Sequence, residues 1–147
     1  RQDEPDVRES AAAFTAEARR LGLDALCDTY TRTFDLQPSC IPYLGVHLFG
    51  DESFKRSRLL TGLAEAYARC GHDAGGELPD HVAVVLRWVP LAGDEEWADL
   101  ARCCLAGPLG DMAATLQDTG NPYRHLLAAA SRLVRAQVES TREVARA

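Results

Sequence analysis

The sequence has almost no lysine, since Lys55 is the only one among its 16 basic residues, and those residues form no run. The 22 acidic residues outnumber them and give a formal net charge of -6 at pH 7. A surface that binds the phosphates of nucleic acid needs clustered cations, so nucleic acid is not an expected partner. A basic peptide or protein segment is electrostatically compatible with this composition.

Long hydrophobic runs are also missing. No apolar stretch approaches the roughly 18 residues that span a bilayer, and the start of the chain has no signal-peptide pattern. The chain begins at Arg1 without a methionine, which leaves room for residues ahead of it. With 147 residues, we expect residues 1–147 to form a single domain that buries about two-thirds of its unfolded surface.

The cysteines form no C-x-x-C pair and are odd in number, which favours a reducing compartment over a disulfide framework. Cys103 and Cys104 are adjacent in a predicted helix, so their side chains diverge and do not share a ligand site easily. Cys27, Cys70 and Cys104 lie on the apolar faces of predicted helices. There we expect cysteine to behave as a small hydrophobic residue.

Patterns for catalysis are absent as well. The chain has no G-x-S-x-G, no H-E-x-x-H, no phosphate-binding loop and no G-x-G-x-x-G. The carboxylates of Glu77 and Asp80 are close in sequence, but no nucleophile or oxyanion feature accompanies them. A zinc site is conceivable but matches no ligand spacing in its candidates Cys40, His47, Cys70 and His72. We therefore expect no enzyme, no metal and no cofactor.

What the chain does have is apolar residues recurring at intervals of three and four. This pattern predicts helices over residues 7–21, 23–35, 43–49, 51–70, 82–89, 95–104, 109–116 and 123–138. Asp94 is an expected N-cap, and Gly107 with Pro108 is expected to break the chain. Tyr30 and Phe34, one turn apart, are expected to be core aromatics. No stretch alternates with period two, so we predict an all-α, single-domain bundle of about six to eight helices.

The segment Gly71–Val89 is the part of the chain that we expect to be functional, because a glycine-rich loop there leads into a strongly apolar helix. Pro79 suits the first turn of that helix, and Asp80 places a negative charge near its exposed N–H groups. The simpler hypothesis is therefore a capped helix start. The alternative is a functional corner, because Glu77 and His81 bring further ionisable side chains to the same place.

Four blocks of the sequence resemble the redox-enzyme maturation chaperones, and the NarJ-type nitrate reductase assembly chaperones more than the TorD-type proteins. The blocks are YTRTF at 30–34, YLGVHLFGDESFKR at 43–56, AYARCG at 66–71 and ELPDHV at 77–82. The Glu-x-Pro-Asp-His motif of the family is matched in full at 77–81. Its aromatic-x-x-Leu-Phe motif corresponds to residues 30–34, with Thr33 in place of the leucine. His47, Gly50 and Arg56 stand where NarJ-like sequences carry the same residues.

The resemblance implies an all-helical, non-enzymatic chaperone in the cytoplasm. Such proteins bind the N-terminal segment of a molybdoenzyme catalytic subunit, here one like that of nitrate reductase, and assist insertion of the molybdenum cofactor and assembly of the complex. Proteins of molybdenum cofactor biosynthesis are further candidate partners. The client-peptide-binding residues that it implies are Tyr30, Phe34, Tyr43, His47, Arg56, Glu77, Pro79, Asp80 and His81. The alternatives are a generic helical interaction or regulatory module and a small metal- or haem-binding helical protein.

Overall fold

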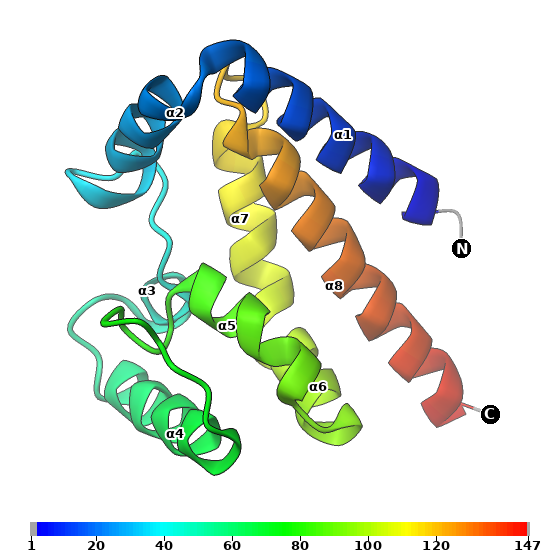
Figure 1. Cartoon of the computed structure of the whole chain (residues 1–147). Helices are drawn as coiled ribbons and strands as arrows, with labels where there is room; N and C mark the ends of the chain where they lie inside the picture. The colour runs from blue at the N-terminus through cyan, green and yellow to red at the C-terminus, as the bar shows by residue number, and fades with distance from the viewer. Residues whose placement is uncertain (1–2, 147) are drawn as a thin grey trace.

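The computed structural model describes residues 3–146, and its side chains from residue 6 to residue 144. Its α-helices are α1 Asp3–Leu21, α2 Leu23–Tyr30, α3 Leu44–Phe49, α4 Phe54–Cys70, α5 Val82–Trp88, α6 Asp94–Leu100, α7 Ala106–Leu116 and α8 Tyr123–Arg146. Short π-helices, η1 Thr31–Asp35 and η3 Ala101–Leu105, and a 3-10 turn, η2 Val89–Leu91, join some of them. The predicted all-α class is confirmed (Figure 1). In the described part of the chain, no helix combines the length and apolarity needed to cross a membrane.

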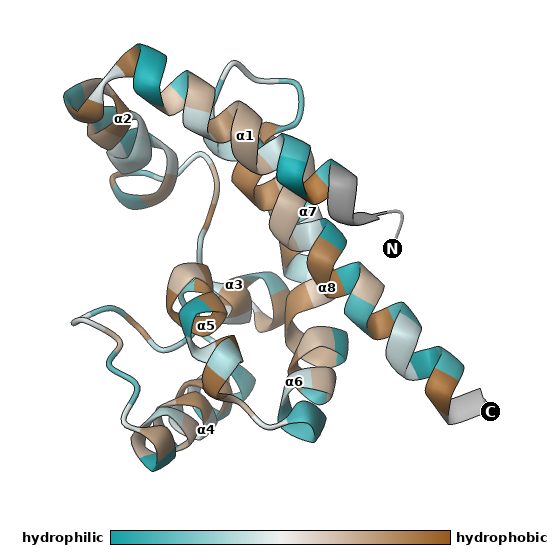
Figure 2. Ribbon diagram, turned by 45° about the vertical axis from the view of Figure 1, so that its right-hand side comes forward, coloured by the Kyte–Doolittle hydropathy of each residue, from teal (hydrophilic) through white to brown (hydrophobic). Residues whose placement is uncertain are grey.

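Helices α1 and α8 run side by side in opposite directions, and α7 packs against α8 (Figure 1). Brown and teal alternate along α8 in Figure 2, as expected for a helix with one buried face. The core lies where α7 meets α8 and η3, and Leu105, Leu109 and Met112 are fully buried there. An ion pair holds α1 to the first turn of α8, because the guanidinium of Arg124 donates to both carboxylate oxygens of Glu17, at 2.6 and 3.1 Å.

The break predicted at Gly107 and Pro108 is wrong. The chain continues from α6 through η3 into α7, and both residues lie in the first turn of α7. Pro108 has no N–H to donate to the turn ahead of it, and in a regular α-helix its ring would clash with the carbonyl one turn earlier. The wide π turn directly ahead takes up the change in geometry between the two helices.

Two predicted helix starts are also corrected. Helix α4 begins after Ser53, whose hydroxyl accepts from the Lys55 N–H at 3.2 Å, and not at Asp51. Asp51 instead uses its carboxylate to accept from Arg56. Asp94, the predicted N-cap, is the first residue of α6 itself, where its charge still favours the positive end of the helix dipole.

The cysteine predictions hold only in part. Cys27 and Cys70 are exposed, because α2 buries none of its residues and Cys70 is the last residue of α4. Cys104 is half-buried, as its apolar face suggested. Cys40 is buried, and burial raises the pKa of its thiol to about 11, which keeps the thiol protonated.

Candidate functional site

Two segments far apart in the sequence meet at the start of α5. Tyr43 and His81 form an isolated antiparallel bridge, and next to it the Leu44 N–H donates to the Asp80 carbonyl at 2.9 Å. These bonds fix the loop that precedes α5 against the segment that precedes α3. The end of the loop next to α5 therefore has a defined conformation, although the glycines of the loop permit many backbone conformations.

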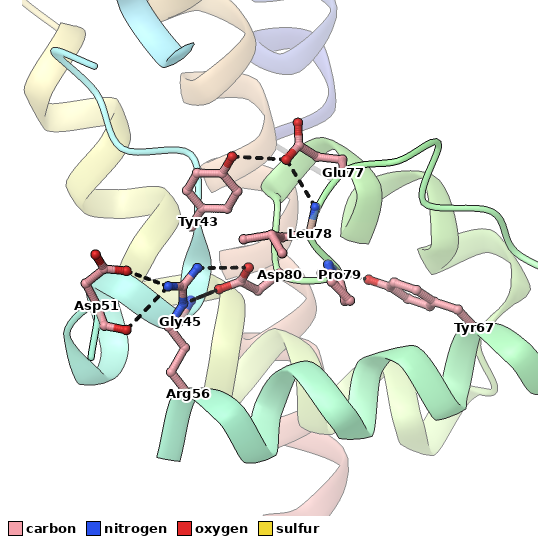
Figure 3. Close-up of polar contacts among 9 residues, drawn as sticks. All are labelled: Tyr43, Gly45, Asp51, Arg56, Tyr67, Glu77, Leu78, Pro79 and Asp80. Atoms are coloured by element: carbon pink, nitrogen blue, oxygen red, sulfur yellow. Dashed lines mark hydrogen bonds and ion pairs between the residues drawn. The ribbon is translucent and has the colours of Figure 1, made fainter. Parts of the chain in front are cut away.

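We call this junction the corner; it comprises Tyr43, Arg56, Glu77, Pro79 and Asp80. A buried ion pair lies at its centre (Figure 3). The Asp80 side chain is fully buried, and its Oδ2 accepts from Arg56 Nε and from the Gly45 N–H, each at 3.1 Å. On its other side, the Arg56 guanidinium donates to Asp51 Oδ1 at 2.6 Å. A buried charge pair persists only where its polar atoms are well satisfied, and these contacts meet that condition.

The predicted helix cap at Asp80 is wrong, because its carboxylate points to Arg56. The N-cap of α5 is His81, whose Nδ1 accepts from the Ala83 N–H at 3.1 Å. Pro79 likewise lies ahead of the helix and not in its first turn, and its carbonyl accepts from the Tyr67 hydroxyl at 2.7 Å. The motif residues therefore link three elements instead of starting one helix.

His81 is buried, and its surroundings keep it neutral. Burial lowers the pKa of its imidazole, and the nearby carboxylates of Glu77 and Asp80 oppose this effect less strongly. The imidazole also packs edge-on against the Tyr43 ring, with centroids 5.4 Å apart. A neutral ring with a free Nδ1 lone pair is the form that caps α5.

Glu77 supplies the exposed carboxylate of the corner. Its Oε1 accepts from the Tyr43 hydroxyl at 3.0 Å and from the Leu78 N–H at 3.1 Å (Figure 3). Burial, together with the bond to Glu77, raises the pKa of Tyr43 to about 12, so the hydroxyl stays a donor. The corner therefore presents a negative charge in a fixed orientation at the protein surface.

An apolar groove opens beside the corner, with a volume of about 170 Å³. It lies between η1, α5 and α8, and almost all of its lining is carbon. The lining residues are Tyr30, Phe34, Pro42, His81, Val82, Ala83, Leu86, Tyr123, Leu126, Leu127 and Ala130. A concave apolar site of this kind suits apolar side chains of a ligand or partner.

Three aromatic rings in the lining of this groove pack against one another. Phe34 lies 5.1 Å from Tyr30 and 5.3 Å from Tyr123, measured between ring centroids, and Tyr30 lies 5.7 Å from Tyr123. Phe34 is buried, as expected for a core aromatic, whereas 39% of Tyr30 is exposed. Phe34 is thus a core residue that also forms the groove wall, and the prediction that Tyr30 is simply a core residue is wrong.

Thr33 occupies the place of the family's leucine without leaving a buried polar group unpaired. Its hydroxyl donates to the Thr29 carbonyl at 2.6 Å and accepts from the Asn121 side-chain amide at 2.7 Å. The Asn121 Oδ1 in turn accepts from the Tyr123 N–H at 3.0 Å and caps α8. This chain of bonds ties η1 to the turn of α8 that carries the groove tyrosine.

The predicted site residues fall into three places. The groove takes Tyr30, Phe34 and His81, and the corner takes Tyr43, Arg56, Glu77, Pro79 and Asp80. His47 stands apart, since its Nε2 lies 2.8 Å from the Ile41 carbonyl and its Nδ1 lies 3.9 Å from Asp111 of α7. Of the zinc candidates, His72 contacts the Val84 carbonyl at 3.1 Å, and among the described residues no three metal-ligating side chains gather.

Sequence reasoning missed the groove residues that α5 and α8 contribute. Leu86 and Leu127 belong to the apolar periods of their helices, which do not mark them as walls of a groove. Leu126 was missed altogether. A signal existed, because Leu126 beside Leu127 widens the apolar stripe of α8 beyond what one buried face needs. Gly45 was also missed, and no local pattern marks its contact with Asp80.

The fold and the site together define the class of protein: an all-helical protein with an apolar groove beside a buried ion pair. A family model described as the nitrate reductase delta subunit matches residues 1–129, and the chain belongs to this family. The suspected family is thereby confirmed, and it is a family of molybdoenzyme maturation chaperones and not of enzymes. No curated protein and no solved structure matches the chain significantly.

Proposed function

We propose that the protein holds the N-terminal segment of a molybdoenzyme catalytic subunit, one like that of nitrate reductase, in the groove between η1, α5 and α8. The observation that carries this proposal is an apolar groove that opens next to a fixed, exposed carboxylate, that of Glu77. While the segment is held, the molybdenum cofactor is inserted and the complex assembles. The protein needs no cofactor of its own for this task and acts in the cytoplasm, before membrane assembly or export.

The groove suits a segment with apolar side chains on one face. In its lining, Tyr30 and Leu126 are each 39% exposed, and Phe34 and Tyr123 add two further aromatic rings. A bound segment, either an amphipathic helix or an extended strand, removes these apolar surfaces from water. Apolar surface that stays exposed to water does not stabilise the free protein. A groove of this composition therefore favours a binding role.

Charge on the rim suits a segment that also carries arginine or lysine. Burial raises the pKa of Tyr30, and the negative charges of Glu77 and Asp35 raise it further, so both carboxylates act on a hydroxyl of the groove lining. The whole chain carries a formal charge of -6, which attracts a basic partner over a longer distance. Such attraction acts mainly on the association rate and orientation.

The buried part of the corner supports the groove and is not itself a contact surface. Asp80 is fully buried and Arg56 nearly so, and they hold the loop whose next residue, His81, lines the groove. We therefore propose Tyr30, Phe34, Glu77 and His81 as client contacts. Tyr43, Arg56, Pro79 and Asp80 support them from behind.

Titration calorimetry with a synthetic peptide of the client's N-terminal segment tests the apolar part of the site. Leu126→Asp places a charge in the groove and is expected to weaken binding about tenfold or more, which is at least ~1.4 kcal/mol. The matched control is Leu91→Asp, at a leucine of η2 that is 54% exposed and lies outside the groove lining. If both variants bind the peptide as tightly as the parent, the segment does not occupy this groove.

The charged part of the site is tested by Glu77→Gln over a range of salt concentrations. We expect weaker peptide binding than that of the parent at low salt, with a difference that shrinks as salt rises, because exposed charges are screened within ~8 Å at physiological ionic strength. A peptide with its basic residues replaced by alanine serves as the control and should bind both proteins equally. Identical binding of the basic peptide to both proteins at low salt would remove Glu77 from the site.

A further inference from the structure

The outer face of α4 is open along its whole length. In both Figure 1 and Figure 2, α4 lies at the edge of the molecule. Its inner face buries Arg56, Leu63 and Tyr67. The residues on its outer face are exposed and comprise Phe54, Ser57, Arg58, Thr61, Gly62 and Glu65. Phe54 is 78% exposed, which is unusual for a large aromatic side chain.

Hollows lie on both sides of Gly62. One, of about 320 Å³, is formed by α4 residues between Phe54 and Glu65, and the other, of about 450 Å³, lies between α4 and η3. Arg58 and Gly62 line both, so the hollows adjoin across the helix. A Cβ atom at Gly62 would meet nothing within 4 Å, so the hollows are open to the outside at this point. A helix surface with hollows beside a glycine allows another helix to approach closely and insert its side chains.

Two charged side chains on this face, those of Arg58 and Glu65, have no partner among the described residues. Arg58 and Glu65 are seven residues apart, which places them on one face of α4 about 10.5 Å apart, too far to pair with each other. Among the described side chains, neither makes a hydrogen bond or an ion pair. Arg69, the neighbour one turn beyond Glu65, is by contrast paired with Glu96 at 2.8 Å.

We propose that this face is an interface between two copies of the chain, in which α4 of one copy crosses α4 of the other in the antiparallel sense. In a two-fold interface, if a residue of the first copy contacts a second residue in the other copy, the same contact also forms with the two copies exchanged. With the axis between Thr61 and Gly62, Arg58 of each copy lies opposite Glu65 of the other, because both are equally far from the axis. The missing side chain at Gly62 lets the helices approach there, and Phe54 of each copy is covered at the end of the interface.

The interface is small. A contact built mainly on one helix falls at the low end of specific interfaces, below about 1,200 Å² in total, and gives a weak and concentration-dependent dimer. The lining of the groove between η1, α5 and α8 includes no residue of α4, so the contact between the two α4 helices covers none of it. The inference is therefore independent of the proposed client binding.

Sedimentation velocity of the whole chain over a range of concentrations tests the proposal. The parent is expected to shift from monomer to dimer as its concentration rises. In the Arg58→Glu variant two negative charges face each other at both symmetry-related contacts, and in the Glu65→Arg variant two positive charges do. Each variant should therefore remain monomeric at concentrations where the parent dimerises. An equal mixture of the two variants should dimerise again, because each introduced charge then faces an opposite charge in the other copy. The double variant Arg58→Glu/Glu65→Arg should do the same.

Arg20→Glu, on the exposed surface of α1, makes the same charge change away from this face and should dimerise like the parent. Circular dichroism confirms that all variants keep their helices. A parent that stays monomeric up to millimolar concentration overturns the proposal, and so does a mixture of the two single variants that stays monomeric. Binding of the client peptide by the monomeric variants would be unchanged, so a failure here does not touch the proposed function.

Discussion

Arg56 Nε donates to Asp80 Oδ2 at 3.1 Å across a sequence separation of 24 residues, and this bond joins α4 to the loop ahead of α5. Asp80 is fully buried and Arg56 is 8% exposed. A charge pair that has left water contributes little net stability, but the loss of one partner costs a great deal, because the other charge remains buried. The corner is therefore sensitive to substitutions that keep its shape and change its charge.

The first prediction is that Asp80→Asn lowers the free energy of unfolding by about 3 kcal/mol. The amide keeps the size of the carboxylate but leaves the buried guanidinium of Arg56 without its closest negative charge. Asp51 still faces the guanidinium from the exposed side, which places the loss at the lower end of the usual range. Urea unfolding followed by circular dichroism measures the change. The double variant Arg56→Gln/Asp80→Asn should cost less than the sum of the single changes, and additive costs would show that the pair is not coupled.

The second prediction concerns the glycine that the Asp80 carboxylate approaches. A Cβ atom at Gly45 would lie 2.7 Å from Asp80 Oδ2 and 2.7 Å from Arg56 Cγ, so Gly45→Ala must displace the buried ion pair. We expect a loss of ~1–3 kcal/mol in the free energy of unfolding, typical of overpacking. Gly107→Ala is the matched control, because this helical glycine has nothing within 4 Å of a Cβ position. Equal stability of the two variants would mean that the corner adapts without cost.

The third prediction is a pH dependence of stability that arises from His81. The pKa of its imidazole is lowered in the folded protein. At pH values between that pKa and the ordinary value of 6.5, the unfolded chain therefore binds more protons than the folded protein. The stabilisation is present in full above pH 6.5 and is lost as the pH falls from there towards the folded pKa. Protonation also removes the Nδ1 lone pair that caps α5. The melting temperature, measured between pH 8 and pH 5 (about 1.5 units on either side of the ordinary pKa), should therefore fall with decreasing pH.

The control for this effect is His81→Asn. Asparagine is a good N-cap and does not titrate, so the variant should keep α5 capped and show a flatter melting profile over the same pH range. An unchanged slope in this variant would assign the pH dependence to other groups. Glu17 is one such group, but its pKa is lowered from 4.5 by its bonds to His125 and Arg124, so its effect appears only at lower pH.

The fourth prediction separates the core of the groove from its edge. Phe34→Ala removes a buried ring from the aromatic cluster and should lower the free energy of unfolding by ~3–5 kcal/mol. Leu126→Ala, at a side chain that is 39% exposed, should leave the melting temperature nearly unchanged and weaken binding of the client peptide. Thermal unfolding and calorimetry on both variants measure the two effects. A Phe34→Ala protein as stable as the parent would show that the ring belongs to the binding surface alone.

The helices and the family were readable from the sequence because their signals are local. Gly22 and Gly71 adopt positive φ at helix ends, Asn121 caps α8, and the apolar period of each helix is written in consecutive residues. The Glu77 to His81 motif is equally local, so its family could be named without coordinates. Even the errors at Gly107 and Pro108 were local, since both residues break helices in most positions, and here the π turn directly ahead accommodates them.

The sequence by itself thus determined an all-α chain of the nitrate reductase delta subunit family, because periodicity, caps and motifs depend on neighbours in the chain. Only the tertiary structure decided that Asp80 faces Arg56 and Gly45 instead of the N–H groups of α5. It also decided that Tyr30 and Leu126, from opposite ends of the chain, border one groove. Such contacts depend on how the helices pack, and no rule of sequence spacing relates residues that meet only after packing.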